Sequence, residues 1–349
     1  MDTGKGRTAL CLDIGSGTQD VLYYLPGEEI ENCPKFVLPA PAVLVEQRIR
    51  ELAARGRNIY LHGRNMGGGF TRGLREWVNK GGKVVAHPDA AMSISDDPQR
   101  VADMGIALSD TCPRGYAPVF CTDFDPGFWQ GYLAQIGLPY PEVVLAAAQD
   151  HGFHPAASNR KGRFKVWESF LQDRQGRVEE LLFETPPKNM TRLAALQEAT
   201  GGGPVADTGA AAVLGALFVP EVETRGRMEG ITVVNVGNSH TIGFLLFEDR
   251  ILGIYEHHTG LLDHGRLCRE VELFRSGELT NETVFNDQGH GCVMAPRPER
   301  AGDFHRVYIL GPRRRLLTGC GEFLAPGGDM MLAGCFGLLK GARMRGLID

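Results

Sequence analysis

The feature that most constrains the fold is a pattern that occurs twice in the chain. Residues 10–24 read LCLDIGSGTQDVLYY and residues 233–247 read VVNVGNSHTIGFLLF. In each, an apolar segment leads to Asp or Asn, one apolar residue and Gly. A short turn rich in Gly, Ser and Thr follows, and the chain then re-enters an apolar segment. This pattern is typical of a β-hairpin, and its return in the second half of the chain predicts two related lobes.

The composition of these turns suits the binding of phosphate. Glycine lets a turn curl so that backbone N–H groups converge on an anion, and Ser or Thr adds hydroxyl donors. An acidic side chain just before the turn can hold Mg²⁺ directly or through water. Single turns of this kind are also common in hairpins that bind nothing. The presence of two such turns, one in each lobe, therefore favours a clamp for the phosphates of a nucleotide.

Between the two hairpins, short apolar segments alternate with helical patterns. Strands are predicted at 58–63, 83–86, 117–122 and 143–148, and helices at 42–55, at 71–80 and from Pro98 onward. Such alternation predicts an α/β fold with a mostly parallel sheet. In sheets of this kind, ligands bind at the carboxyl ends of the strands.

Polar residues follow the last of these strands. Gln149, Asp150 and His151 come directly after the strand at 143–148, so we expect them on the substrate side of a cleft. A turn that holds a hydrogen-bonded histidine is the alternative. The segment HGRNMGGG (62–69) also has two interpretations: a loop whose glycines allow the lobes to pack closely, or an anion site at a helix N-terminus.

A change in composition separates the two halves of the chain. Residues 155–205 are more polar and rich in Pro and Gly. We place the boundary near Gly201–Gly203, which gives lobe I as 1–205 and lobe II as 206–349. A short helix of small residues is then predicted at 207–218. It is followed by an antiparallel meander of three strands, at 231–236, 242–247 and 251–255.

The order of these features resembles the actin-like ATPase superfamily, which includes the sugar kinases and the heat-shock chaperone ATPases. Asp13–Asp20 is similar to its first phosphate loop, Asn235–Thr241 to its second, and VADTGAAAVLGAL (205–217) to its connecting helix. VYILGPRRRLL (307–317) resembles the strand and turn at the adenosine, and PGGDMMLAGCFGLLKGA (326–342) the helix after it. The resemblance implies a two-lobed, ribonuclease H-like α/β fold whose interlobe cleft binds ATP and Mg²⁺.

The resemblance also implies roles for single residues. Asp13 and Asn235 would hold Mg²⁺, and Asp207 would orient a water or hydroxyl nucleophile, with Asp20 as a further candidate acid. The second loop of the superfamily normally begins with Asp, whereas the amide of Asn235 adds no charge and cannot act as a base. The nucleotide would contact Gly15, Ser16, Gly17, Thr18, Gly237, Asn238, Ser239, Thr241 and Gly311.

The function implied is phosphoryl transfer or ATP hydrolysis that acts on an unknown small molecule or protein client. More narrowly, DIGSGTQDVLYY, ENCPKFVLPAP, GRNMGGG and NVGNSHT resemble a prokaryotic family labelled as pyruvate formate-lyase activating enzymes. Radical activases of that name hold an iron–sulfur cluster with three cysteines at CxxxCxxC spacing, and the sequence has no such triplet. Two alternatives stay open: an ATP-dependent activator of a redox or radical enzyme, and a nucleotide-binding scaffold without catalysis.

Cysteine and histidine give the remaining chemical signals. The eight cysteines are scattered, so we expect no disulfide framework and mostly buried thiols. Residues 256–292 are rich in side chains that can bind metals, but their spacing matches no fixed zinc signature. Polar strand ends that face the cleft are the alternative. The candidate ligands are His257, His258, Asp263, His264, Cys268, His290 and Cys292.

Charge and hydropathy exclude some classes of partner. The formal net charge of −5 and the pI near 6.1 argue against general binding to nucleic acid or to anionic membranes. The sequence has no apolar run of the roughly 18 residues that a membrane span needs. We expect a cytoplasmic protein, with a homodimer among its expected assemblies.

Overall fold

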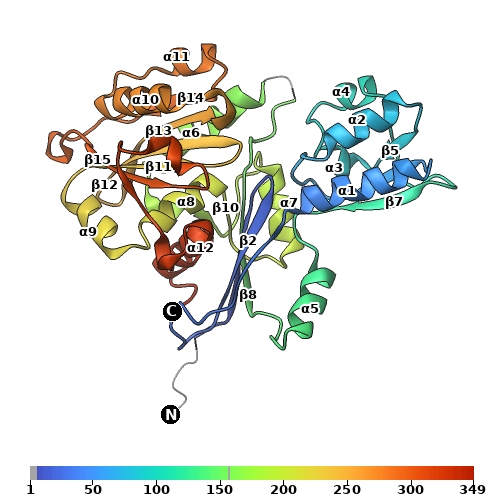
Figure 1. Ribbon diagram of the computed structural model, residues 1–349, viewed down its shortest axis with the longest axis horizontal. Coiled ribbons are helices and arrows are strands. Elements are labelled where there is room, and N and C mark those ends of the chain that lie inside the picture. The colour runs from blue at the N-terminus through green and yellow to red at the C-terminus, as the bar shows by residue number, and fades with distance from the viewer. Residues whose placement is uncertain (1–5, 156–157) are drawn as a thin grey trace.

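The computed structural model describes residues 6–155 and 158–349, which contain three β-sheets (Figure 1). The first sheet has six strands in the order β3-β2-β1-β8-β10-β9. Strands β1, β2 and β3 form an antiparallel meander, and β8 and β10 extend the sheet parallel to β1. The strands are β1 (Ala9–Ile14), β2 (Thr18–Tyr24), β3 (Lys35–Pro39), β8 (Val143–Ala148), β9 (Leu182–Phe183) and β10 (Val205–Ala206).

The second sheet repeats this arrangement in the order β14-β13-β12-β11-β15-β16. Strands β11, β12 and β13 form a meander, and β15 and β16 extend it parallel to β11. When β9 and β14 are left out and the other strands of each sheet are numbered along the chain, both sheets have the order 3-2-1-4-5. This is the ribonuclease H-like arrangement that the resemblance implies, and the predicted fold class is confirmed. The strands are β11 (Ile231–Val236), β12 (His240–Phe247), β13 (Arg250–His258), β14 (Gly291–Met294), β15 (Arg306–Leu310) and β16 (Glu322–Phe323).

Both predicted hairpins form, and their strands are buried on both faces. In β1, Leu10 and Leu12 pack into one hydrophobic cluster, whereas Ala9 and Cys11 pack into another on the opposite face. A strand covered on both faces needs no polar residue at alternate positions. This explains why the sequence of each hairpin is apolar almost without interruption.

A smaller sheet, entirely parallel, is inserted between β3 and β8 in the order β6-β5-β4-β7. It has its own hydrophobic core, and Figure 1 shows it with its helices beside the first sheet. The predicted parallel sheet is confirmed here, whereas the two larger sheets are mixed. The elements are β4 (Ile59–Gly63), β5 (Val84–Ala86), β6 (Ile106–Leu108), β7 (Ala117–Cys121), α1 (Pro41–Ala54), α2 (Thr71–Asn79), α3 (Pro88–Ala91) and α4 (Pro98–Asp103), followed by α5 (Pro126–Gln135).

Two helices of small residues pack against each other between the larger sheets. These are α8 (Thr208–Ala216), close to the predicted helix at 207–218, and α12 (Ala333–Met344). A Cβ at Gly215 would overlap the backbone of Ala333, and one at Gly337 would overlap the carbonyl oxygen of Ala211. Glycine is therefore required where the helices cross. Since α8 contacts β1 and β11, and α12 contacts β1 and β8, the pair joins the two lobes.

The polar segment that precedes the predicted boundary contains two α-helices. Helix α6 (Asn159–Asp173) buries Phe164, Trp167 and Phe170 against the second sheet, and α7 (Thr191–Ala199) packs on β8. One face of α6 is apolar although the composition of the segment is polar. The boundary at residue 205 stays a prediction: α6 lies before it yet packs on the second sheet, and α12 lies after it yet packs on the first.

Two cysteines depart from the expectation of buried thiols. Cys268 and Cys320 form a disulfide that links α10 (His264–Ser276) to the segment after β15. Five other cysteines are buried thiols as predicted, and Cys112 is exposed. The remaining helices are α9 (Pro220–Met228) and α11 (Asn281–Asn286). Across the described ranges, no helix combines the length and apolarity that crossing a membrane requires.

Candidate functional site

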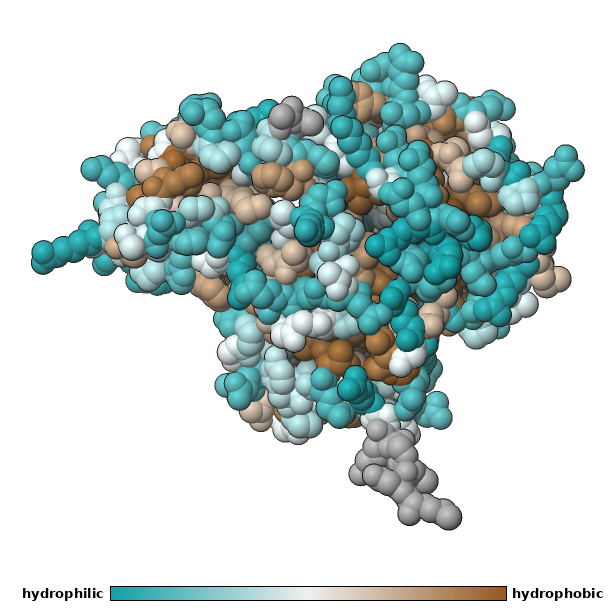
Figure 2. Space-filling model, turned by 180° about the vertical axis from the view of Figure 1, so that it is seen from behind, coloured by the Kyte–Doolittle hydropathy of each residue, from teal (hydrophilic) through white to brown (hydrophobic). Residues whose placement is uncertain are grey.

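A cavity of about 370 Å³ opens between the two larger sheets, beside the ends of β1, β8 and β11. Its walls come from both hairpin turns, from the segment after β8 and from the loop that precedes α2. A volume of this size is typical of a small-molecule site. Seen from behind in Figure 2, hydrophilic residues cover most of the surface, and apolar residues show as separate patches among them.

Both hairpin turns have the same backbone geometry and face this cavity. The amide of Gly15 donates to the carbonyl oxygen three residues later at 2.9 Å, and the amide of Gly237 does the same at 2.9 Å. The two turns also touch, because the Oγ atoms of Ser16 and Ser239 lie 2.9 Å apart. Segments that are more than two hundred residues apart in the sequence thus form one continuous wall.

All but one of the residues predicted to contact the nucleotide line this cavity. The exception is Thr241, which is fully buried and whose hydroxyl lies 3.0 Å from that of Thr259. Gly311 has a φ of +96°, and a Cβ there would overlap the carbonyl oxygen of Val236, so this turn requires glycine. The lining residues are Gly15, Ser16, Gly17, Thr18, Gly237, Asn238, Ser239 and Gly311.

Two carboxyl groups lie beside the first turn. Asp13 and Asp20 are directly opposite each other on β1 and β2, and both line the cavity. Burial, together with the charge of Asp20, raises the pKa of Asp13 to about 8. Burial, together with the charge of Asp329, raises the pKa of Asp20 to about 7. The Oδ1 atom of each is buried without a hydrogen-bond partner, which is costly unless a cation or a proton is present.

This arrangement fits Mg²⁺. Two unpartnered carboxylate oxygens are the hard donors that Mg²⁺ prefers, and the ion usually keeps several waters and takes its other ligands from phosphate. Asn235 also lines the cavity, from the strand end that is equivalent to Asp13 in the second hairpin. Its amide oxygen can complete such a site without adding charge.

Asp207, the predicted nucleophile-orienting residue, lies behind the cavity wall. Its side chain is 1% exposed and accepts hydrogen bonds from Gly209 N, at the start of α8, and from both terminal nitrogens of Arg163. The Nε atom of Arg163 donates to Glu256 at 2.8 Å. The sequence analysis missed Arg163 and Glu256. A buried arginine between two buried carboxylates cannot be recognised before strand and helix positions are known.

The segment after β8 lies at the cavity, but its side chains are partly engaged in hydrogen bonds within the protein. Gln149 donates to Glu256 at 2.8 Å. The carboxylate of Asp150 accepts from the backbone of Gly152 at 2.7 Å and of Leu193 at 3.0 Å, so it fixes a turn. His151 differs, because its Nδ1 atom is buried without a hydrogen-bond partner. Burial lowers the pKa of this histidine to about 3.

The predicted ligands between residues 256 and 292 separate into different places. His257 and His258 point to opposite faces of β13, so that His257 approaches Arg266 while His258 approaches His240 and His290. Asp263 caps α10 by accepting from Arg266 N.

Three further predicted ligands, like His257 and Asp263, lie away from His258 and His290. His264 and Cys268 lie on α10 next to Cys320. Cys292 is buried in the second lobe. The structure therefore does not bring the whole set together.

Residues 66–316 match a protein family described as "Putative pyruvate format-lyase activating enzyme (DUF1786)". The chain belongs to this family. The match includes the segment after β8, α8 and the second hairpin, and it ends in the turn that contains Gly311. No curated protein that was compared with the chain matches it.

Solved structures with similar folds are distant in sequence. A protein from Bacteroides thetaiotaomicron with an actin-like ATPase fold and unknown function is 7% identical, with 95% of this chain and 96% of that chain covered and a TM-score of 0.36. MreB 5 of Spiroplasma citri, solved bound to AMPPNP, is 10% identical, with 97% and 95% covered and a TM-score of 0.36. An exopolyphosphatase-like protein is 9% identical with a TM-score of 0.29, and 88% of this chain spans 66% of it.

Proposed function

We propose that the chain binds ATP with Mg²⁺ in the cavity between the larger sheets and uses it for phosphoryl transfer or hydrolysis. The observation that carries this proposal is the contact between Ser16 and Ser239, which brings two glycine turns from different lobes to one wall beside two unpartnered carboxyl groups. Turns of this composition offer converging N–H groups to an anion. A triphosphate with its metal would satisfy the turns and the carboxylates together.

The first hairpin supplies the negative charge of this site. Asp13, with the amide of Asn235, would hold Mg²⁺, and the hydroxyls of Ser16 and Ser239 would bind phosphate oxygens. The bound Mg²⁺ would neutralise charge on the β- and γ-phosphates. Transfer breaks the bond between the γ-phosphorus and the bridging oxygen, leaves ADP, and forms a bond to the oxygen of water or of a substrate hydroxyl.

Asp207 is best placed to position other groups. Both of its oxygens are engaged by Arg163 and the start of α8, and one also accepts from the backbone N–H of Asp150 at 3.1 Å. It would hold the substrate-side segment after β8 in place, while Asp20, which lines the cavity, would be a candidate acid beside the reacting phosphate.

Calorimetric titration with ATP in the presence and absence of Mg²⁺ tests the proposal. We expect binding that depends on Mg²⁺ in the wild type and its loss in Asp13→Asn, because the neutral amide removes the charge while it keeps the shape. Asp303→Asn, at an exposed site, is the matched control. No binding in the wild type, or equal binding in Asp13→Asn, would contradict the proposal.

A second candidate function is ATP-dependent activation of a redox or radical enzyme, in line with the activating enzyme that the family description names. The observation that favours it is the pair Cys268 and Cys320, which form a half-buried disulfide within reach of His264. Such a pair releases two electrons and two protons when the dithiol is oxidised. Alkylation of free thiols in glutathione buffers of graded potential tests this role. A midpoint potential of this cysteine pair within the range of cytosolic glutathione potentials supports the role. A pair that stays oxidised in every buffer contradicts it.

A further inference from the structure

We propose that His240, His258 and His290 form a binding site for a divalent transition metal on the wall of the cleft. The site is separate from the oxygen-rich Asp13 position and does not depend on nucleotide binding. It would take an ion that imidazole nitrogen favours, such as Zn²⁺ or Fe²⁺, in preference to Mg²⁺.

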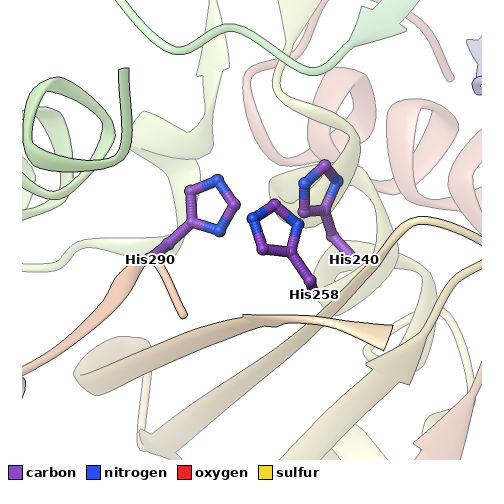
Figure 3. Close-up of side chains that lie close together, drawn as sticks. All are labelled: His240, His258 and His290. Atoms are coloured by element: carbon purple, nitrogen blue, oxygen red, sulfur yellow. The ribbon is translucent and has the colours of Figure 1, made fainter. Parts of the chain in front are cut away.

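Three neighbouring strands bring the histidines together. His240 begins β12 and is paired directly with His258, the last residue of β13. His290 immediately precedes β14, and its backbone N–H donates to the carbonyl oxygen of Glu256 at 2.9 Å. The ring centres are 5.0 Å apart for His240 and His258, 4.8 Å for His240 and His290, and 4.6 Å for His258 and His290. Figure 3 shows the three rings grouped at the end of the sheet.

The ring nitrogens are close enough to share one ion. One nitrogen from each ring lies within 4.8 Å of those from the other two. Metal–nitrogen bonds of about 2.0–2.1 Å in a tetrahedral site place the nitrogens about 3.3 Å apart. Modest rotation of the rings covers this difference. The cross-strand pairing of His240 and His258 keeps two of the ligands in register while the rings adjust.

These nitrogens lack protein partners. Within residues 6–155 and 158–349, the side chains of His240, His258 and His290 make no hydrogen bond. His290 is 2% exposed, and its Nδ1 atom is buried without a partner. Buried polar atoms are nearly always paired in folded proteins. A cluster of unpaired imidazoles at one point is therefore better explained by a ligand that binds their lone pairs than by packing.

The surroundings can balance the charge of an ion. Glu256 is fully buried on β13, two residues before His258, and carries a negative charge that is only partly offset by its ion pair with Arg163. His151 stacks on His290 with ring centres 5.7 Å apart, and its Nδ1 atom is also unpartnered. His151 and His240 both line the cavity. The fourth ligand position would therefore face the cleft, as in catalytic metal sites that keep one position for water or substrate.

Metal analysis of the purified full chain tests this site. We expect about one equivalent of a transition metal per chain after anaerobic purification. After chelation and addition of Co²⁺, we expect the visible absorption bands of a nitrogen-ligated, four-coordinate ion. The double variant His258→Asn, His290→Asn should lose both signals, and circular dichroism should show the fold retained. His305→Asn, at a half-exposed histidine away from the cluster, is the control and should keep both signals.

Two outcomes would overturn the inference. One is a wild-type protein that takes up no Co²⁺ or Zn²⁺ in equilibrium dialysis. The other is a folded double variant that binds as much metal as the wild type. Asp13→Asn separates this site from the nucleotide site, since it should abolish ATP binding and leave the Co²⁺ bands unchanged. Failure of ATP binding alone therefore does not affect the histidine site.

Discussion

The turn after β1 and the turn after β11 share one backbone geometry but carry different side chains. In the first hairpin, two carboxyl groups, Asp13 and Asp20, face each other across the strands. At the same register in the second hairpin, Asn235 faces Ile242. The second hairpin instead continues into His240 and the histidine cluster. The two hairpins thus share the backbone frame that presents N–H groups, but acidic oxygens lie beside the first turn and histidine nitrogens beside the second.

Loss of the buried ion pairs that link the two halves of the molecule should have the largest effect on stability. Arg163 joins Asp207, at the start of α8, to Glu256 on β13, and all three are almost completely buried. Arg163→Met would leave two buried carboxylates without their ion-pair partner, at a cost of about 3–5 kcal/mol in the free energy of unfolding. Denaturant titration measures this change. Arg72→Met, whose side chain is 81% exposed, is the control and should cost at most about 1 kcal/mol. Equal losses in both variants would contradict the linking role.

The acidic pair of the first hairpin predicts that the stability of the protein depends on pH. Burial raises the pKa of Asp13 and Asp20 in the folded protein to about 8 and about 7, above the ordinary aspartate value of 3.8. The folded state therefore binds protons more tightly than the unfolded state, and stability without Mg²⁺ should fall as pH rises from about 4 to about 8.

Thermal unfolding in the presence of a chelator measures this slope. Asp20→Asn should flatten it, because one titrating group is removed, and Asn235→Ala should leave it unchanged, because no proton is bound there. A slope that is the same in Asp20→Asn and in the wild type would contradict the assignment.

An acidic residue at position 235 of the second hairpin, equivalent to Asp13 of the first, should change the rate of ATP hydrolysis. Asn235→Asp gives the second turn the acid that the superfamily resemblance implies, and the new carboxylate would strengthen Mg²⁺ binding. We expect ATP hydrolysis to rise by about tenfold, which corresponds to about 1.4 kcal/mol in the activation free energy. A release assay for phosphate measures it. A rate at the level of buffer in both proteins would favour the non-catalytic scaffold.

The smallest expected effect is on ATP affinity, and it distinguishes two hydroxyl-bearing residues of the second hairpin. Ser239 faces the cavity, whereas Thr241 is buried against Thr259. Ser239→Ala should weaken ATP binding by about fivefold, the equivalent of one hydrogen bond of about 1 kcal/mol. Thr241→Val should leave affinity unchanged and lower only the stability. Calorimetric titration of both variants with ATP measures these affinities. A larger loss of affinity in Thr241→Val than in Ser239→Ala would contradict the placement of the two hydroxyls.

The parts of the fold that depend on local patterns could be predicted from the sequence. The hairpins, the small-residue helix α8 and the strand at 143–148 follow from apolar runs and glycine turns that are close together in the chain. Helix α6 was missed because charged residues separate Phe164, Trp167 and Phe170, although their spacing is that of one helix face.

Features that need contacts between distant residues could not be predicted. Cys268 and Cys320 are 52 residues apart, and nothing in the intervening sequence indicates that they meet. His240 was not among the predicted metal ligands because it lies 18 residues before His258 in the chain. A signal did exist: pairing β12 with β13 around the turn at 248–249 would have placed the two side by side.

The most direct test is a crystal structure of the chain with Mg²⁺ and a non-hydrolysable ATP analogue. We expect the phosphates to lie between Gly15–Thr18 and Gly237–Ser239, with Asp13 on the metal side and the base near Gly311. An analogue bound elsewhere, or bound by one turn while the other stays in contact with protein alone, would contradict a nucleotide site shared by both lobes.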